Sequence, residues 1–222
     1  MLGVGGLPST SPFYNWLAKT PYRWASPQGF VQNRDGATRK FFSKDYSTRV
    51  ARITSLRKEV IPWCWPVPFK TDDFVENALA LIRAGCLGVL VDAEGDFYSG
   101  VVDLPKSTVE FQLRGLLTKL AEARVPYGVL TYGAPTRYHP GFPWAAYAER
   151  VRWVLPMLYR ENPDIGATIE SQRKVVMPGA VFTPVLSVSR DSYKGDATSR
   201  KTKKGSYAAW NWQKLRAAGR TR

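Results

Sequence analysis

The stretch EVIPWCWPVPFKTDDFVENALALIRAGCLGVLVDAE, residues 59–94, decides the fold. Its pattern predicts a strand over Glu59–Pro66, a helix over Thr71–Ala84 and a second strand over Leu87–Glu94. Both predicted strands are short apolar runs, and the segment between them has helical periodicity. Two apolar strands joined by a helix are typical of a parallel βα unit.

The helix between these strands has a start signal, an apolar face and a stop signal. Thr71 is predicted to cap the first turn, and Asp72 and Asp73 suit the positive end of the helix dipole. Gly85 is predicted to end the helix. The apolar face is formed by Phe74, Ala78, Leu81 and Ile82.

The same unit recurs along the chain and gives eight predicted strands in all. The other strands are predicted at Pro12–Leu17, Gly29–Asn33, Tyr127–Tyr132, Trp153–Tyr159, Val181–Val188 and Tyr207–Trp212. Further helices are predicted at Thr48–Lys58, Thr108–Ala123, Pro143–Arg150 and about Ile165–Val175. Eight apolar strands with helices between them predict an α/β fold of the (β/α)8 TIM-type barrel class. An open doubly wound sheet is the alternative, although no glycine-rich nucleotide-binding motif follows any strand.

The last part of the chain departs from a regular barrel. The connection SRDSYKGDATSRKTKKGS, residues 189–206, is polar and has no apolar face, so the seventh helix is predicted to be degraded. The stub QKLRAAGRTR after Trp212 predicts only a short C-terminal helix. We therefore expect one flank of the barrel to lack its usual cover.

Composition and charge predict one basic globular domain over residues 1–222. Hydrophobic residues make up 44% and charged residues 23%, which is enough apolar material for a full core. The net charge is +14, and the loop and tail at 190–222 contain ten Lys or Arg and two Asp. Such a basic flank attracts polyanions such as nucleic acid or anionic cell-wall polymers, or the acidic face of another subunit of an assembly. A solvated basic tail with no dedicated partner is equally compatible with this composition.

Several classes of site and location are disfavoured by the residue inventory. Cys64 and Cys86 lie in apolar runs and are predicted to be buried thiols rather than a disulfide. With a single histidine and no Cys/His cluster, neither a catalytic metal nor another cofactor is predicted. The N-terminal residues do not form a standard secretory signal, and no apolar run is as long as a membrane span, so synthesis in the cytoplasm is expected.

Two carboxylates at the end of the strand over Leu87–Glu94 are the candidate catalytic groups. Asp92 and Glu94 are two residues apart, so they are predicted to share one face with Cα atoms about 6 to 7 Å apart. Carboxylates this close in a partly dry pocket do not ionise independently, and the pKa of one of them is raised. That is the arrangement a general acid needs, although Asp92 capping a loop and Glu94 in solvent is an equally simple explanation.

Aromatic and polar residues accompany the carboxylates at the predicted strand ends. In a βα barrel the active site is built where strands end and loops begin. Aromatic rings around paired carboxylates are typical of sugar-binding sites. The predicted sugar-binding residues are Asp35, Trp63, Trp65, Tyr132, His139, Tyr159, Trp210 and Trp212.

The order of these motifs resembles a known family. The succession VIPWCWP, GVLVDAEGDF, YGVLTYGAPTRYHPGFPW, VRWVLPMLY and YAAWNWQ is similar to the glycoside-hydrolase-like barrels of bacterial and phage genomes, which are distantly related to lysozyme-type and chitinase-type barrels. This resemblance implies that Glu94 is the proton donor and that Asp92 assists it. It also implies a sugar site lined by Tyr132, His139, Tyr159 and Trp210.

Three functions are compatible with the sequence. The first is a glycosidase that acts on a cell-wall or surface polysaccharide, with Glu94 as general acid. The second is a noncatalytic component of a phage virion or tail, which docks through the basic flank or binds glycans. The third is nucleic-acid binding, which is disfavoured because the aromatic residues are not interleaved with the basic cluster.

Overall fold

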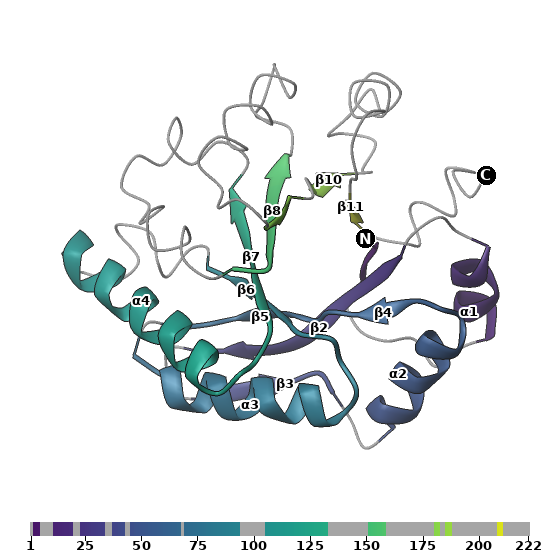
Figure 1. Cartoon of the computed structure of the whole chain (residues 1–222), viewed down its shortest axis with the longest axis horizontal. Coiled ribbons are helices and arrows are strands. Elements are labelled where there is room, and N and C mark those ends of the chain that lie inside the picture. The colour runs from purple at the N-terminus through teal and green to yellow at the C-terminus, as the bar shows by residue number, and fades with distance from the viewer. Residues whose placement is uncertain are drawn as a thin grey trace.

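We analysed a computed structural model of the chain (Figure 1). The structure describes residues 2–4, 11–19, 23–33, 37–42, 45–67, 69–93, 105–132, 151–158, 180–182, 185–187 and 208–210. The predicted helices at 143–150 and 165–175, the polar connection at 189–206 and the C-terminal stub lie outside these residues.

In the described part of the chain, helices alternate with one or two strands as far as residue 132, and the described elements that follow are all strands (Figure 1). The first half contains β1 (Leu2–Val4), α1 (Ser11–Ala18), β2 (Trp24–Gln32), β3 (Thr38–Lys40), α2 (Tyr46–Ser55), β4 (Glu59–Val60), β5 (Trp63–Trp65), α3 (Thr71–Arg83) and β6 (Val89–Asp92). The second half contains α4 (Lys106–Glu122), β7 (Tyr127–Tyr132), β8 (Trp153–Leu158), β9 (Val181–Phe182), β10 (Val185–Ser187) and β11 (Ala208–Trp210).

The strands form one sheet in the order β1-β11-β10-β8-β7-β6-β5-β2-β3. Every pairing is parallel except that of β3, which runs antiparallel to β2. Strand β1 pairs with β11 on one side and with β2 on the other. Parallel strands need crossover connections, and helices α1, α2, α3 and α4 supply those that lead to β2, β4, β6 and β7. The predicted mixed α/β fold with a parallel sheet is confirmed.

The prediction of a strand over Pro12–Leu17 is wrong, because this segment lies inside helix α1. Phe13, Tyr14, Trp16 and Leu17 are buried, whereas Asn15 is exposed. That spacing is helical, and a strand with one buried face alternates instead. The strand that opens the sheet is β1, which was not predicted.

Two other predicted strands are each divided into two in the structure. The run Glu59–Pro66 forms β4 and β5, separated at Ile61 and Pro62, and proline has no N–H to donate to a ladder. The run Val181–Val188 forms β9 and β10. The predicted strand at Gly29–Asn33 belongs to β2, which begins earlier, at Trp24.

Helix α3 begins at Thr71, as the sequence predicts, and ends at Arg83, one residue before the predicted end, but its first turn is stabilised differently. The predicted cap by Thr71 is wrong, because Thr71 is already helical and Lys70 precedes the helix without a side-chain cap. The Thr71 hydroxyl instead accepts a hydrogen bond of 3.1 Å from Lys119 Nζ of α4. Gly85 follows α3 with φ of +95°, a backbone conformation that favours glycine.

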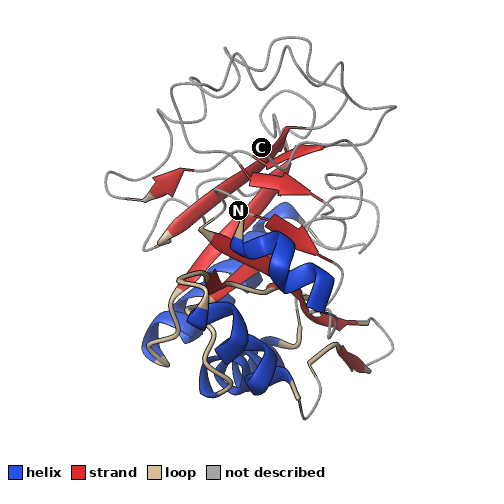
Figure 2. Cartoon of the chain, turned by 90° about the vertical axis from the view of Figure 1, so that its right-hand side faces the viewer, coloured by secondary structure: helices blue, strands red, loops and turns tan. Residues whose placement is uncertain are grey.

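Two apolar clusters lie on opposite faces of the sheet. The larger one, the helix-side cluster, joins the four helices to strand residues such as Val89 and Val91. The far-side cluster consists of Ile61, Leu90, Leu130, Trp153 and Leu155, with Trp24, Trp63 and Leu87 packed against it. Figure 1 places α2, α3 and α4 along one side of the strands, and Figure 2 shows the same helices beside the strands after a 90° turn. Residues that alternate along a strand therefore alternate between the two clusters.

In the described part of the chain, no helix combines the length and apolar character needed to cross a membrane.

Candidate functional site

Asp92 is the last residue of β6 and lies at the carboxyl edge of the parallel sheet. Leu90, two residues earlier, belongs to the far-side cluster, whereas Val91 belongs to the helix-side cluster. Strand alternation therefore puts Asp92 on the same face as Leu90. Asp92 is only 6% exposed. A carboxylate is thus held largely out of water where functional groups of parallel α/β folds gather.

The register of the sheet surrounds Asp92 with apolar residues. Its Cα position pairs with Leu130 of β7, and Leu130 pairs with Leu155 of β8. Leu130 is 2% and Leu155 0% exposed, and both belong to the far-side cluster. These leucines therefore shield the Asp92 carboxylate from water on this side. A charge in such surroundings interacts more strongly with other charges than it does in water.

Two predicted sugar-binding residues, Trp63 and Trp65, reach the same face from β5. Trp63 pairs with Leu90 and packs against the far-side cluster, whereas Cys64 pairs with Val91 and packs in the helix-side cluster. One residue further along this register, Trp65 is level with Asp92. Both tryptophans are half-buried. The structure thus brings an acid and two indole rings to one edge and one face of the sheet.

The other predicted site residues are only partly placed. Tyr132 ends β7 and pairs with Met157, and Trp210 ends β11 and pairs with Gly3 and Ser187. These are backbone positions in strands of the same sheet. The remaining predicted site residues, Asp35, Glu94, His139, Tyr159 and Trp212, lie outside the described residues.

A polar brace beside the site has no counterpart in the sequence analysis. Gln32 at the end of β2 is buried, and its Nε2 donates to the Lys70 carbonyl at 2.9 Å and to Asp73 Oδ2 at 2.8 Å. Its Oε1 accepts from the Val67 amide at 3.0 Å. Thr38 on β3 donates to the same Asp73 oxygen at 2.6 Å. The brace fixes the loop that follows Trp65 to β2 and to the first turn of α3.

Electrostatics at Asp73 follow from these contacts. Burial raises the pKa of the Asp73 carboxyl, but hydrogen bonds from Thr38, Gln32 and Asn77 outweigh this effect, and the net pKa is lowered. Asp73 is therefore ionised at neutral pH and is a structural anion. The sequence signal for the brace is Gln32, a polar residue at the end of the buried strand β2.

The two cysteines are free thiols in the helix-side core, as predicted. Burial raises the pKa of Cys64 well above its usual range, a backbone hydrogen bond from Phe30 opposes this rise, and interactions with Cys86 and Asp92 add to it. Burial also raises the pKa of Cys86 to about 12, against a hydrogen bond with Tyr46. Neither thiol is a nucleophile at neutral pH.

Comparison with known proteins gives a likeness in structure but not in sequence. No family model and no curated protein matches the chain. Among solved structures, the C-terminal domain of a Desulfitobacterium hafniense chitinase-type protein matches with a TM-score of 0.65 at 13% identity, over 84% of this chain and 66% of that one. A GH18 chitinase from Pseudoalteromonas aurantia matches with a TM-score of 0.63 at 12% identity, over 100% and 99%. The Bacillus cereus spore cortex-lytic enzyme SleL matches with a TM-score of 0.56 at 12% identity, over 84% and 50%.

These matches show the fold alone, because identity is so low. The chain has a chitinase-like glycoside-hydrolase fold, and the predicted resemblance to chitinase-type proteins is confirmed at that level. The chain spans slightly under two thirds of the Desulfitobacterium domain and half of the SleL chain.

Proposed function

We propose that this chain is a glycoside hydrolase built on a chitinase-like (β/α)8 barrel, and that it acts on a cell-wall or surface polysaccharide. Two findings support the barrel. Strand β1 pairs with both β2 and β11, and the structures of similar fold are chitinases and a cortex-lytic enzyme. A TIM-type barrel carries its catalytic groups at the carboxyl ends of its strands.

The observation that carries the proposal is the position of Asp92. It is a buried carboxylate at the carboxyl edge of β6, on the face shared with Trp63 and level with Trp65. Burying a carboxylate is costly, so a fold has little reason to place one there for packing alone. Indole rings beside it offer the flat apolar surface on which sugar rings stack.

The proposed chemistry needs two carboxyl groups with different roles. Glu94 protonates the glycosidic oxygen as the bond to the leaving sugar breaks. Asp92, or the acetamido group of the substrate itself, stabilises the positive charge that develops at the anomeric carbon. Asp92 is buried, and a carboxylate in such a setting interacts strongly with a second carboxyl group or with the developing positive charge.

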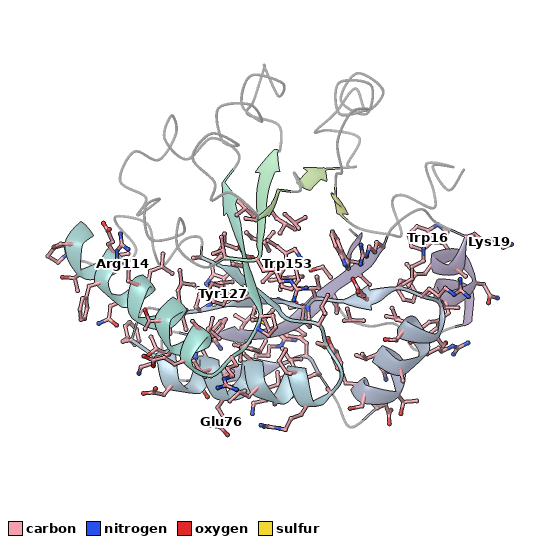
Figure 3. All side chains as sticks on the ribbon, in the orientation of Figure 1. Trp16, Lys19, Glu76, Arg114, Tyr127 and Trp153 are labelled. Carbon is pink, nitrogen blue, oxygen red and sulfur yellow. The ribbon has the colours of Figure 1, made fainter. Side chains whose placement is uncertain are left out.

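The test is turnover of chito-oligosaccharides and purified peptidoglycan by the wild-type protein, Glu94→Gln and Asp92→Asn. We expect Glu94→Gln to lower kcat by about 10²- to 10⁴-fold, the usual contribution of a general acid. Asp92→Asn is expected to lower kcat as well, while KM changes little. Glu76→Gln is the matched control, because Glu76 is an exposed acid on the outer side of α3 (Figure 3). Hydrolysis by Glu94→Gln at the wild-type rate would refute the assignment.

The alternative of a noncatalytic phage virion or tail component gains no support from the structures of similar fold. It makes a different prediction in the same assay. Wild-type protein that binds the glycans but hydrolyses none of them would favour it over the hydrolase.

A further inference from the structure

Basic residues mark the amino edge of the sheet, the edge opposite Asp92. Parallel strands begin at the same edge, so the residues just before them lie together there. We define the amino-edge cations as Arg23 before β2, Arg57 and Lys58 before β4, Arg124 before β7, and Arg152 before β8. The four arginines are exposed and Lys58 is half-buried. Within the described connections from helix ends to strand starts, no residue is Asp or Glu, but Glu59, the first residue of β4, lies at the same edge and pairs with Arg23 at 3.4 Å.

Backbone pairing fixes these positions relative to the sheet. The Glu59 amide donates to the Arg23 carbonyl at 2.9 Å, which ties the start of β4 to the start of β2. The Arg152 amide donates to the Tyr127 carbonyl at 2.9 Å, and the Val181 amide donates to the Arg152 carbonyl at 2.9 Å. Backbone hydrogen bonds therefore hold Arg23 and Arg152 at the starts of their strands. Figure 3 shows Tyr127 and Trp153 side by side where β7 and β8 begin.

Two of the arginines cover tryptophan rings. The Arg23 guanidinium lies 5.6 Å from the Trp24 ring centroid, and that of Arg152 lies 5.0 Å from the Trp153 ring centroid. Trp153 is only 2% exposed, and both rings pack in the far-side cluster. A partner at this edge would therefore meet positively charged side chains, whereas the faces of these two tryptophan rings are already covered by arginine.

Two other arginines occupy strained backbone. Arg57 has φ of 57° after α2 and Arg124 has φ of 55° after α4, whereas Gly85 takes the corresponding place after α3. A left-handed conformation is unfavourable for a residue with a Cβ, and glycine avoids this cost. The interaction of a cation with the helix dipole at a C-terminus is smaller than this cost. The dipole also does not explain Arg23 and Arg152, which do not directly follow described helices.

We propose that the amino-edge cations form a docking surface for an anionic cell-wall polymer that carries phosphodiester groups. Guanidinium groups pair with phosphate through parallel hydrogen bonds, and exposed arginines spread along an edge suit an extended polyanion. Single-stranded nucleic acid fits less well, because it needs open aromatic faces for its bases. The choice of a wall polymer as the partner rests on the proposed function. The location of the surface rests only on the positions of the amino-edge cations. Docking at this edge leaves the edge with Asp92 open to a glycan chain.

The test measures binding of poly(glycerol phosphate) to the full chain and to Arg57→Gly/Arg124→Gly. These substitutions remove two cations and relieve two strained conformations, so the variant is expected to be at least as stable as the wild type in urea. We expect its Kd to rise by about tenfold or more and its dependence on salt to weaken. Arg39→Gln/Lys40→Gln is the matched control, because it removes the same charge from exposed positions of β3, which pairs with the last residues of β2.

Each outcome decides the proposal. An equal loss of binding in both double variants would mean that net charge alone attracts the polymer, and the proposed surface would be wrong. A single-stranded oligonucleotide of matched charge that binds more tightly than the polymer, with the same loss in the glycine variant, would assign the surface to nucleic acid instead. If the protein binds the polymer but hydrolyses no glycan, the proposed docking surface is supported and only the proposed activity is refuted.

Discussion

Gly128 of β7 is a position where one added methyl group should be strongly destabilising. A Cβ there would lie 2.6 Å from the Trp153 Cβ, 2.7 Å from the Trp153 carbonyl oxygen and 2.9 Å from Leu90 Cδ2. Carbon atoms in contact prefer about 3.5–4.0 Å, so the two approaches to carbon are too short by roughly 1 Å, and the approach to the oxygen is also well inside contact distance. Two of the three atoms are on or next to the backbone and do not move by a rotamer change. Strands β7 and β8 would have to separate.

We expect Gly128→Ala to destabilise the protein by about 3 kcal/mol, the upper end of the usual cost of overpacking. For a chain of this length this corresponds to a fall in Tm of roughly 6–12 °C. The measurement is urea and thermal unfolding followed by circular dichroism. Gly115→Ala on α4 is the matched control, because a Cβ there meets nothing within 4 Å and alanine favours helix by about 1 kcal/mol. A Gly128→Ala protein as stable as wild type would refute the packing of Trp153 against β7.

Three further predictions follow from the same contacts. Gly85→Ala should cost about 1–2 kcal/mol in urea unfolding, because φ is +95° and the new Cβ would lie 3.3 Å from Val50 Cγ1. Asp73→Asn should be less stable than wild type in urea unfolding at pH 7. The pKa of Asp73 is lower in the folded protein than the ordinary value of 3.8, so the carboxylate stabilises the fold above pH 3.8. This stabilisation is lost as the pH falls through the folded pKa, and the two proteins should then become equally stable. Cys64 and Cys86 should not react with a thiol reagent at pH 8 until the protein is unfolded, because both thiol pKa values are raised, that of Cys86 to about 12.

The sequence predicts the central part of the fold because local patterns suffice there. The bounds of β7 are as predicted because Pro126 and Gly133 flank its apolar run, and the start of α3 is as predicted because helical periodicity begins there with Asp72 and Asp73 in the first turn. The prediction of a strand at residues 12–17 is wrong for a physical reason. Its aromatic side chains favour strands by propensity, whereas their spacing is helical, and burial on a helix prevailed.

Contacts between distant residues are what the sequence does not reveal. The bond from Gln32 to Asp73 spans 41 residues, and the pairing of Trp63 with Leu90 depends on the register of two strands. Strand alternation alone predicts that Asp92 faces the same side as Leu90. It does not predict that the leucines of β7 and β8 bury the carboxylate. The positive φ at Arg57 and Arg124 is equally invisible, because glycine is the residue that normally signals it.

The separation of charge between the two edges of the sheet matters for the proposed glycoside hydrolysis. From Val89 to Asp92 the strand rises about 10 Å, close to the distance at which salt screens exposed charges. The arginines at the amino edge are exposed, so solvent and salt screen their charges over this distance. They can therefore attract an anionic polymer while adding little to the field at Asp92. A cation beside the two carboxyl groups would instead favour the ionised form of Glu94, the proposed proton donor, and so weaken it as an acid.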